Sequence, residues 1–329
     1  MSVTSDIIIG PDGRPDAASS GRVAVAVGGI IDAHHHFWDL ANNHYPWLQE
    51  QLITAHFGDY AAIRRSYLAP DLRADLGQVN LAASVHIEAH WRGGTAPEGE
   101  TAWLTGHARD HGLPSVMMGA ADLAAPDLDQ VLAAHQAFPG FRGIRVMAMG
   151  RGAPEGAALY RDPQFQRGMA AMVAQDLCVD LQAPPITHVA VADLAAQFPK
   201  ARIAITHCGL PLDRSAEGLE RWRDGMSRLA EAPNVVVKLS GLAMTDWHWT
   251  CDSLAPLVQH LRTAFGPRRL MFGSNFPVDG LFSDYPTLLA GYVAALGPLP
   301  EADLRAIFHD TAKGFYRIDT PQPPKSKTP

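Results

Sequence analysis

The sequence predicts a (β/α)₈ barrel, in which eight parallel strands alternate with helices around one core. Short apolar runs alternate with longer helical patterns along most of the chain, and these runs number eight. Strands buried on both faces typically read as nearly continuous apolar runs. A chain of 329 residues, 47% of them hydrophobic, can also enclose so large a core. The expected strands are Gly29–His34, Ala83–Glu88, Ser115–Gly119, Phe141–Val146, Cys178–Gln182, Arg202–His207, Val235–Ser240 and Leu270–Asn275.

The segments between these strands contain helix candidates. One begins at Asp162, which can cap a helix whose first position is Pro163. The expected helices are Thr101–His111, Asp162–Gln175, Thr187–Phe198, Ala216–Ala230, Asp252–Phe265 and Pro300–Tyr316. An open doubly wound sheet is the alternative fold, but no GxGxxG follows the first strand and there is no P-loop.

We expect one domain with a peripheral segment at each end. Residues 1–28 and 317–329 carry Ser, Gly, Pro and Ala with little amphipathic pattern, and we interpret them as an N-terminal arm and a flexible C-terminal tail. The barrel then covers residues 29–316. Within it, residues 37–81 hold seven aromatic side chains, and we expect this stretch to lie over the barrel mouth.

Composition excludes several classes of function. A net charge of −7 gives no basic surface for nucleic acid. No apolar run approaches the roughly 20 residues that span a bilayer, and the N-terminus has no secretory pattern. The 3 cysteines are widely spaced without a CxxC motif, which favours a reducing compartment. We therefore expect a cytoplasmic protein without membrane or nucleic-acid partners.

Ionisable or amide side chains stand at the carboxyl ends of most expected strands, where such barrels place their active sites. His34 and His36 lie two residues apart on the first strand and therefore project to one side. A buried core would not tolerate these groups unpaired. The corresponding residues at the other strands are His86, Glu88, His90, Arg145, Asp180, Gln182, His207, Lys238, Ser240, Ser274, Asn275 and, slightly beyond, Asp279.

Most of these residues admit a functional and a structural interpretation. His34, His36 and His207 are candidate ligands for a divalent metal, or hydrogen-bonded histidines at the barrel rim. Arg145 is either a fork that grips a substrate carboxylate or carbonyl, or the partner of Glu88 or Asp180. The structural interpretation of Lys238 is an internal ion pair, and that of the aromatic residues near the mouth, Trp38 among them, is packing.

Six segments resemble the amidohydrolase superfamily, in its amidohydrolase-2 branch. The resemblance is to the lactonase-like group that includes 2-pyrone-4,6-dicarboxylate lactonase and L-fuconolactonase, and it spans about residues 29–316 in the family's order. The first and last segments are the specific ones. The matching segments are residues 31–39 (IDAHHHFWD), 87–88 with 100–103 (IE, ETAW), 143–145 (GIR), 206–211 (THCGLP), 239–241 (LSG) and 269–278 (RLMFGSNFPV).

The resemblance implies roles as well as a fold. His34 and His36 match the family's HxH motif, and His207 matches its histidine on strand six. The last segment normally carries an Asp as general base or metal ligand, and here that position is Asn275. An amide cannot take a proton from water near neutral pH. The base would then have to be another group: Asp279, Asp32, Glu88 or a histidine.

We therefore expect a hydrolase that opens the lactone of a small carboxylated sugar acid or aromatic-catabolism intermediate. The expected catalytic residues are His207, Asn275 and Arg145, and Arg145, Glu88, Trp38 and Asp279 are the expected substrate contacts. Zn²⁺ or Mn²⁺ is a possible cofactor, and metal-independent action is the alternative. A lactone isomerase or decarboxylase, and a non-catalytic ligand-binding barrel, are the rival functions. A homodimer is a possible assembly.

Overall fold

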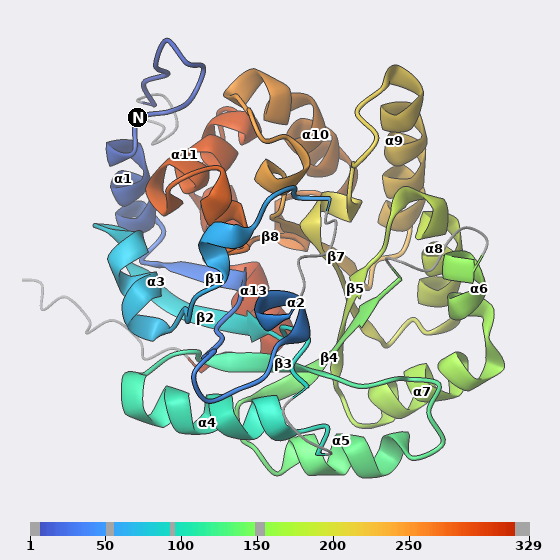
Figure 1. Cartoon of the computed structure of the whole chain (residues 1–329). Coiled ribbons are helices and arrows are strands. Elements are labelled where there is room, and N and C mark those ends of the chain that lie inside the picture. The colour runs from blue at the N-terminus through green and yellow to red at the C-terminus, as the bar shows by residue number, and fades with distance from the viewer. Residues whose placement is uncertain (1–6, 51–55, 93–95, 149–154, 320–329) are drawn as a thin grey trace, which may run out of the picture.

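The computed structural model describes residues 7–50, 56–92, 96–148 and 155–319 and confirms the predicted (β/α)₈ barrel (Figure 1). One parallel sheet runs in the order β1-β2-β3-β4-β5-β6-β7-β8. Each expected strand is present, shifted by at most a few residues. The strands are β1 Ile30–His35, β2 Leu81–Ile87, β3 Val116–Ala120, β4 Phe141–Met147, β5 Cys178–Gln182, β6 Arg202–Ile205, β7 Val235–Leu239 and β8 Leu270–Phe272.

The barrel closes between β1 and the segment that follows β8. The Asn275 amide donates to the His34 carbonyl at 2.7 Å, and the His36 amide donates to the Phe276 carbonyl at 2.8 Å. The buried carboxylate of Asp32 reinforces this seam, because it accepts hydrogen bonds from the Ser274 amide at 2.9 Å and the Ser274 hydroxyl at 2.6 Å. The last predicted strand therefore ends early, and its final residues form the edge of the barrel mouth.

The six expected helices are confirmed, with small shifts at their ends. Asp162 caps α7 as expected, since its side chain accepts a hydrogen bond from the Gln164 amide. The last expected helix is divided into α12 and α13 by a π-helical segment, Ala306–Asp310. The helices are α1 Ala18–Ala26, α2 Pro46–Gln49, α3 Ala69–Leu76, α4 Gly99–His111, α5 Leu128–Gln136, α6 Glu155–Arg161, α7 Pro163–Ala174, α8 His188–Gln197, α9 Ala216–Ala230, α10 Cys251–Phe265, α11 Tyr285–Leu296, α12 Glu301–Arg305 and α13 Thr311–Tyr316.

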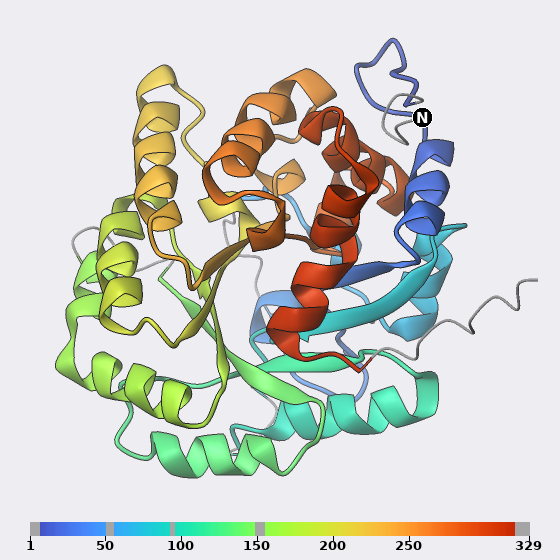
Figure 2. The same cartoon turned by 180° about the vertical axis from the view of Figure 1, so that it is seen from behind.

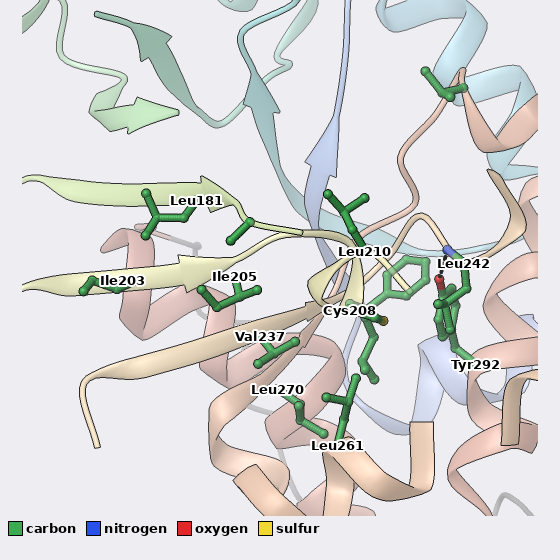
Figure 3. Close-up of a cluster of buried hydrophobic side chains, with 14 of the residues drawn as sticks. Leu181, Ile203, Ile205, Cys208, Leu210, Val237, Leu242, Leu261, Leu270 and Tyr292 are labelled. Atoms are coloured by element: carbon green, nitrogen blue, oxygen red, sulfur yellow. Dashed lines mark hydrogen bonds between the residues drawn. The ribbon is translucent and has the colours of Figure 1, made fainter. Parts of the chain in front are cut away.

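The main core lies between the strands and the surrounding helices. Figure 3 shows part of it, where side chains of β5 to β8, such as Ile205 and Val237, lie with Leu261 of α10. The Tyr292 hydroxyl of α11 accepts a hydrogen bond from the Leu242 amide at 3.2 Å, which ties the loop after β7 to this helix. Burial of apolar side chains on both faces of the strands is the main force that stabilises the barrel.

The C-terminal helix α13 closes one end of the barrel, as Figure 2 shows from behind. Its Ala312, Phe315 and Tyr316 pack against apolar residues inside the barrel, among them Ile31 and Val85. The Cys178 thiol, at the start of β5, donates to the Phe315 carbonyl at 3.3 Å. This end of the barrel is therefore filled, which leaves the opposite, carboxyl end for a site.

Part of the expected N-terminal arm is helical. Helix α1 packs against α11 at the periphery of the barrel, and both views place the two helices side by side (Figures 1 and 2). The domain boundaries themselves stay a prediction. Among the described residues, no helix is both long and apolar enough to cross a membrane.

Candidate active site

Three imidazole rings meet at the carboxyl end of the barrel. The rings of His34 and His207 have their centroids 4.4 Å apart, and those of His34 and His36 are 5.1 Å apart. All three side chains are buried. The structure thus brings together the three histidines that the sequence places on the first and sixth strands.

One ring nitrogen of each histidine meets a different group. Nδ1 of His36 lies 2.7 Å from the Ile87 carbonyl, so Nδ1 carries a proton and Nε2 has a lone pair. Nδ1 of His207 lies 3.1 Å from the Ser240 hydroxyl. Nδ1 of His34 lies 3.4 Å from the ammonium of Lys238, and its buried Nε2 has no hydrogen-bond partner within the part of the chain that the structure describes.

Burial lowers the pKa of all three imidazoles well below the ordinary value. The positive charge of Lys238 lowers the pKa of His34 further, and that of Arg145 does the same for His36 and His207. The three rings are therefore neutral at physiological pH in the free protein.

The backbone at two strand ends adopts a left-handed conformation. His207 has φ of 52° and Asn275 has φ of 57°, a region that non-glycine residues rarely occupy. Two glycines make room for the rings. A Cβ on Gly273 would lie 2.6 Å from the His34 Cβ, and a Cβ on Gly241 would lie 2.5 Å from the His207 Nδ1. The local sequence is thus shaped to hold these side chains.

Asn275 is held in one orientation by groups behind it. Its Nδ2 donates to Asp279 Oδ1 at 2.9 Å and contacts the Met244 sulfur at 3.5 Å. Burial raises the pKa of Asp279 to about 7, although the hydrogen bond from Asn275 acts against this. Asp279 is fully buried, and its hydrogen bond orients the side-chain amide of Asn275. The carbonyl oxygen of Asn275 is the end of the amide that these bonds leave free.

Arg145 is tied to other side chains of the barrel end. Its Nη1 donates to the carboxylate and to the carbonyl of Glu88, both at 3.2 Å, and its Nη2 donates to the Gln182 side chain. Burial opposes ionisation of Glu88, yet the charges of His90 and Arg145 lower its pKa to about 2. The ion pair with Glu88 is thus present, while the role of Arg145 as a substrate contact stays a prediction. Its Nε is buried and has no hydrogen-bond partner in the described ranges of the chain.

A cavity of about 390 Å³ adjoins Arg145 and Glu88 over strands β2 to β4. Polar groups and apolar groups share its walls, so it suits a small molecule that presents both. The lining residues are Glu88, His90, Trp91, Arg92, Ala96, Pro97, Ala120, Ala121, Asp122, Leu123, Arg145, Val146, Met147, Leu159 and Phe165.

Trp38, an expected substrate contact, lies behind the imidazole cluster. It is fully buried, its ring stacks on His36 with centroids 6.2 Å apart, and its indole N–H donates to the Arg65 carbonyl at 2.7 Å. Like Asp279, it supports a residue of the cluster from behind. The aromatic stretch around it packs on itself, with the rings of Trp38 and Trp47 5.4 Å apart.

Sequence analysis gave no role to Glu100, which the structure places under the site. Its carboxyl accepts a hydrogen bond from the Ala89 amide at 3.1 Å, directly after Glu88, and lies 3.6 Å from Nε2 of His86. The only signal in the sequence was the ETAW segment. A single acidic residue near the start of a helix predicts an exposed position, which is why its burial was not anticipated.

Glu100 should make stability depend on pH. Burial and the charge of Glu88 raise its pKa from 4.5 to about 8. Over this range the folded protein keeps a proton on Glu100 that the unfolded chain releases. The free energy of unfolding should therefore fall by about 1.4 kcal/mol for each pH unit as the pH rises from roughly 5 to 8. We expect Glu100→Gln to flatten this dependence in urea unfolding measured across that range. Glu220→Gln, on the exposed face of α9, is the control, and an unchanged slope in Glu100→Gln would contradict the prediction.

The donor set does not fit a metal ion as it is arranged. Within residues 7–50, 56–92, 96–148 and 155–319, no group of three or more His, Cys, Asp or Glu side chains is placed to hold one. The carboxylate expected on the last strand is replaced by Asn275, and the Lys238 ammonium lies 3.4 Å from Nδ1 of His34. A divalent metal ion prefers anionic ligands, and a positively charged ammonium so close to one of the imidazoles is unfavourable for it.

The fold and this site define a class: (β/α)₈-barrel enzymes with a histidine cluster at the carboxyl ends of the strands. Comparison with known proteins agrees. The amidohydrolase family model matches residues 31–318, so the chain belongs to the amidohydrolase family.

Individual relatives cover nearly the whole barrel. The chain is 39% identical to an uncharacterised protein, y4mH, of Sinorhizobium fredii, over 88% of this chain and 98% of that one. It is 31% identical to an L-fucono-1,5-lactonase of Burkholderia ambifaria, over 88% and 96%. A crystal structure of a Burkholderia multivorans amidohydrolase with bound zinc matches with a TM-score of 0.74 at 30% identity, over 88% of this chain and 99% of that one. The expected resemblance is thereby confirmed.

Proposed function

We propose that the protein hydrolyses a lactone, the internal ester of a small sugar acid. The observation that carries this proposal is the cluster of three neutral, buried imidazoles beside Asn275 and Arg145 at the barrel end. Such a set of neutral donors and acceptors suits the attack of water on an ester carbonyl. The 31% identity to an L-fucono-1,5-lactonase supports the same reaction.

In this mechanism, His207 and Arg145 polarise the lactone carbonyl. The Ser240 hydroxyl can donate to Nδ1 of His207, which leaves a proton on Nε2 for the carbonyl oxygen. Water then attacks the carbonyl carbon, a new C–O bond forms, and the ring C–O bond breaks. The proton lost by the water ends on the alkoxide that leaves the ring, so the product is the open hydroxy acid.

His36 is the group that remains as proton acceptor. Asp32 is occupied by hydrogen bonds from Ser274, Tyr285 and the His34 amide. Glu88, with a pKa of about 2, is paired with Arg145. Asp279 lies behind Asn275. Nε2 of His36 has a lone pair because Nδ1 donates to the Ile87 carbonyl, and the free oxygen of Asn275 can orient the water.

The cavity beside Arg145 indicates how the rest of the substrate is held. Its charged and polar groups, among them Arg92 and Asp122, suit the hydroxyl groups of a sugar acid, and a substrate carboxylate would find Arg92 and Arg145. Leu123 and Phe165 on its walls suit the apolar face of a ring. We further propose that the enzyme acts in the cytoplasm, and the expected homodimer stays a prediction.

The experiment that tests this function is proton release from a panel of lactones. Sugar-acid 1,5- and 1,4-lactones and pyrone or muconolactone carboxylates would be offered to enzyme purified without added metal, then again with EDTA and with Zn²⁺ or Mn²⁺. We expect acid release on sugar-acid lactones that survives EDTA. Product mass separates the rivals, because hydrolysis adds water, isomerisation leaves the mass unchanged and decarboxylation loses carbon dioxide. No release on any lactone in any condition would contradict the proposal.

A further inference from the structure

We infer that Lys238 fixes His34 in the tautomer with its proton on Nε2, so that His34 is a hydrogen-bond donor in the site rather than a metal ligand. The inference concerns the free enzyme. Only the identity of the acceptor, the lactone carbonyl oxygen, rests on the proposed function.

The tautomer of His34 follows from the hydrogen bonds that the Lys238 ammonium donates. The side chain is fully buried, and its three protons have three acceptors: Asp180 Oδ2 at 2.6 Å, the Ala33 carbonyl at 2.7 Å and His34 Nδ1 at 3.4 Å. The Tyr316 hydroxyl donates to Oδ1 of the same Asp180 side chain at 2.8 Å, so both of its oxygens accept hydrogen bonds. An ammonium has no lone pair to accept with, so Nδ1 of His34 must be the acceptor.

The proton of the neutral His34 ring is therefore on Nε2. That nitrogen is buried and has no hydrogen-bond partner among the described residues. A buried N–H without an acceptor is unfavourable, so its place in the cluster points to an acceptor supplied by a ligand. His36 has the opposite tautomer because Ile87 accepts from its Nδ1. The two histidines of the HxH motif thus differ: one donates and the other accepts.

This assignment explains why the cluster fits a metal poorly. A metal ligand must offer a lone pair, and zinc would have to displace the proton that Lys238 keeps on Nε2 of His34. The end of the last strand also offers a metal ion no negative charge, because Asn275 stands where the family normally carries a carboxylate. A positioning residue on β7 therefore sets the chemistry of a histidine on β1.

Long-range nitrogen–proton NMR of the full chain labelled with ¹⁵N-histidine tests the tautomer directly. His34→Gln assigns the signals. In the wild type we expect His34 to show a protonated Nε2 and an unprotonated Nδ1. A protonated Nδ1 in the wild type would overturn the inference, and this measurement needs neither substrate nor a further variant.

The variant Lys238→Met/Asp180→Asn removes both charges together, so neither partner is left buried and unpaired. We expect an Nδ1-protonated population of His34 to appear in it, and an unchanged tautomer would overturn the role of Lys238. The matched control is Arg161→Met/Asp193→Asn, which removes an exposed ion pair of 3.8 Å and should leave His34 unchanged.

Zinc titration of the same proteins gives a second readout. We expect the Lys238→Met/Asp180→Asn variant to bind Zn²⁺ at least about tenfold more tightly than the wild type, since the ammonium no longer keeps the proton on Nε2. Tight stoichiometric zinc in the wild type that is lost in His34→Gln would overturn the inference. Lactone hydrolysis is scored separately, so a protein inactive on the panel still gives a decisive tautomer and zinc result.

Discussion

Replacement of His207 by alanine is expected to lower kcat/KM for lactone hydrolysis by about a hundredfold or more, equivalent to about 2.7 kcal/mol of barrier. The reason is geometric. The His207 ring is buried 4.4 Å from His34, and the Ser240 hydroxyl lies 3.1 Å from its Nδ1. In the proposed mechanism, Nε2 therefore carries the proton that is donated to the lactone carbonyl. Steady-state hydrolysis of the preferred lactone measures the loss.

A structural role must be separated from a catalytic one. His207→Gln keeps a side chain of similar polarity in the pocket, and Ser240→Ala removes only the partner of Nδ1. We expect His207→Gln to retain the thermal stability of the wild type but not its activity, and Ser240→Ala to lose less activity than either His207 variant. His260→Ala, on the outer helix α10, is the control and should be fully active. Near-wild-type rates for His207→Ala would contradict the assignment.

The strands and the histidines on them could be predicted from the sequence because both depend on local pattern. Apolar runs buried on both faces are distinctive, and His34, His36 and His207 immediately continue such runs. Helices α1, α2, α3, α5, α6 and α11 were not anticipated. Helix α11 is almost entirely buried, and apolar residues lie on all of its faces. Such a helix has no polar face, so its sequence does not show the helical repeat of apolar and polar residues.

The hydrogen-bond partners of the site depend on contacts between distant segments and could not be predicted. The Tyr316 hydroxyl reaches Asp180 from a helix 136 positions further along the chain. Asn275 has a left-handed backbone, and its amide donates to Asp279, four residues ahead. That spacing brings side chains together in a helix, but the segment between these two residues is not helical, so the contact could not be inferred from a helical pattern. From the sequence, Arg145 could be a substrate contact or the partner of Glu88 or Asp180, because all of these need an arginine at the same strand end. The structure pairs Asp180 with Lys238 instead.

We expect Arg145→Met to reduce kcat/KM at least tenfold and also to destabilise the protein by about 3–5 kcal/mol, because it leaves the Glu88 carboxylate buried without its partner. Arginine and glutamate are 3.2 Å apart, and both side chains are at most 7% exposed. Loss of activity in this single variant therefore does not distinguish a substrate contact from a structural ion pair. Urea unfolding and steady-state kinetics would be measured on the same preparations, with Arg109→Met on the exposed surface as the control.

The double variant Arg145→Met/Glu88→Gln makes the distinction. It removes both charges, so we expect it to regain most of the stability that Arg145→Met loses. Its activity should stay at least tenfold low, because the cation that polarises the carbonyl or grips the substrate is still absent. Recovery of activity together with stability would instead show that Arg145 serves only to neutralise Glu88. In that case the polarising role would fall to His207 and His34 alone, and the substrate would need no anionic group.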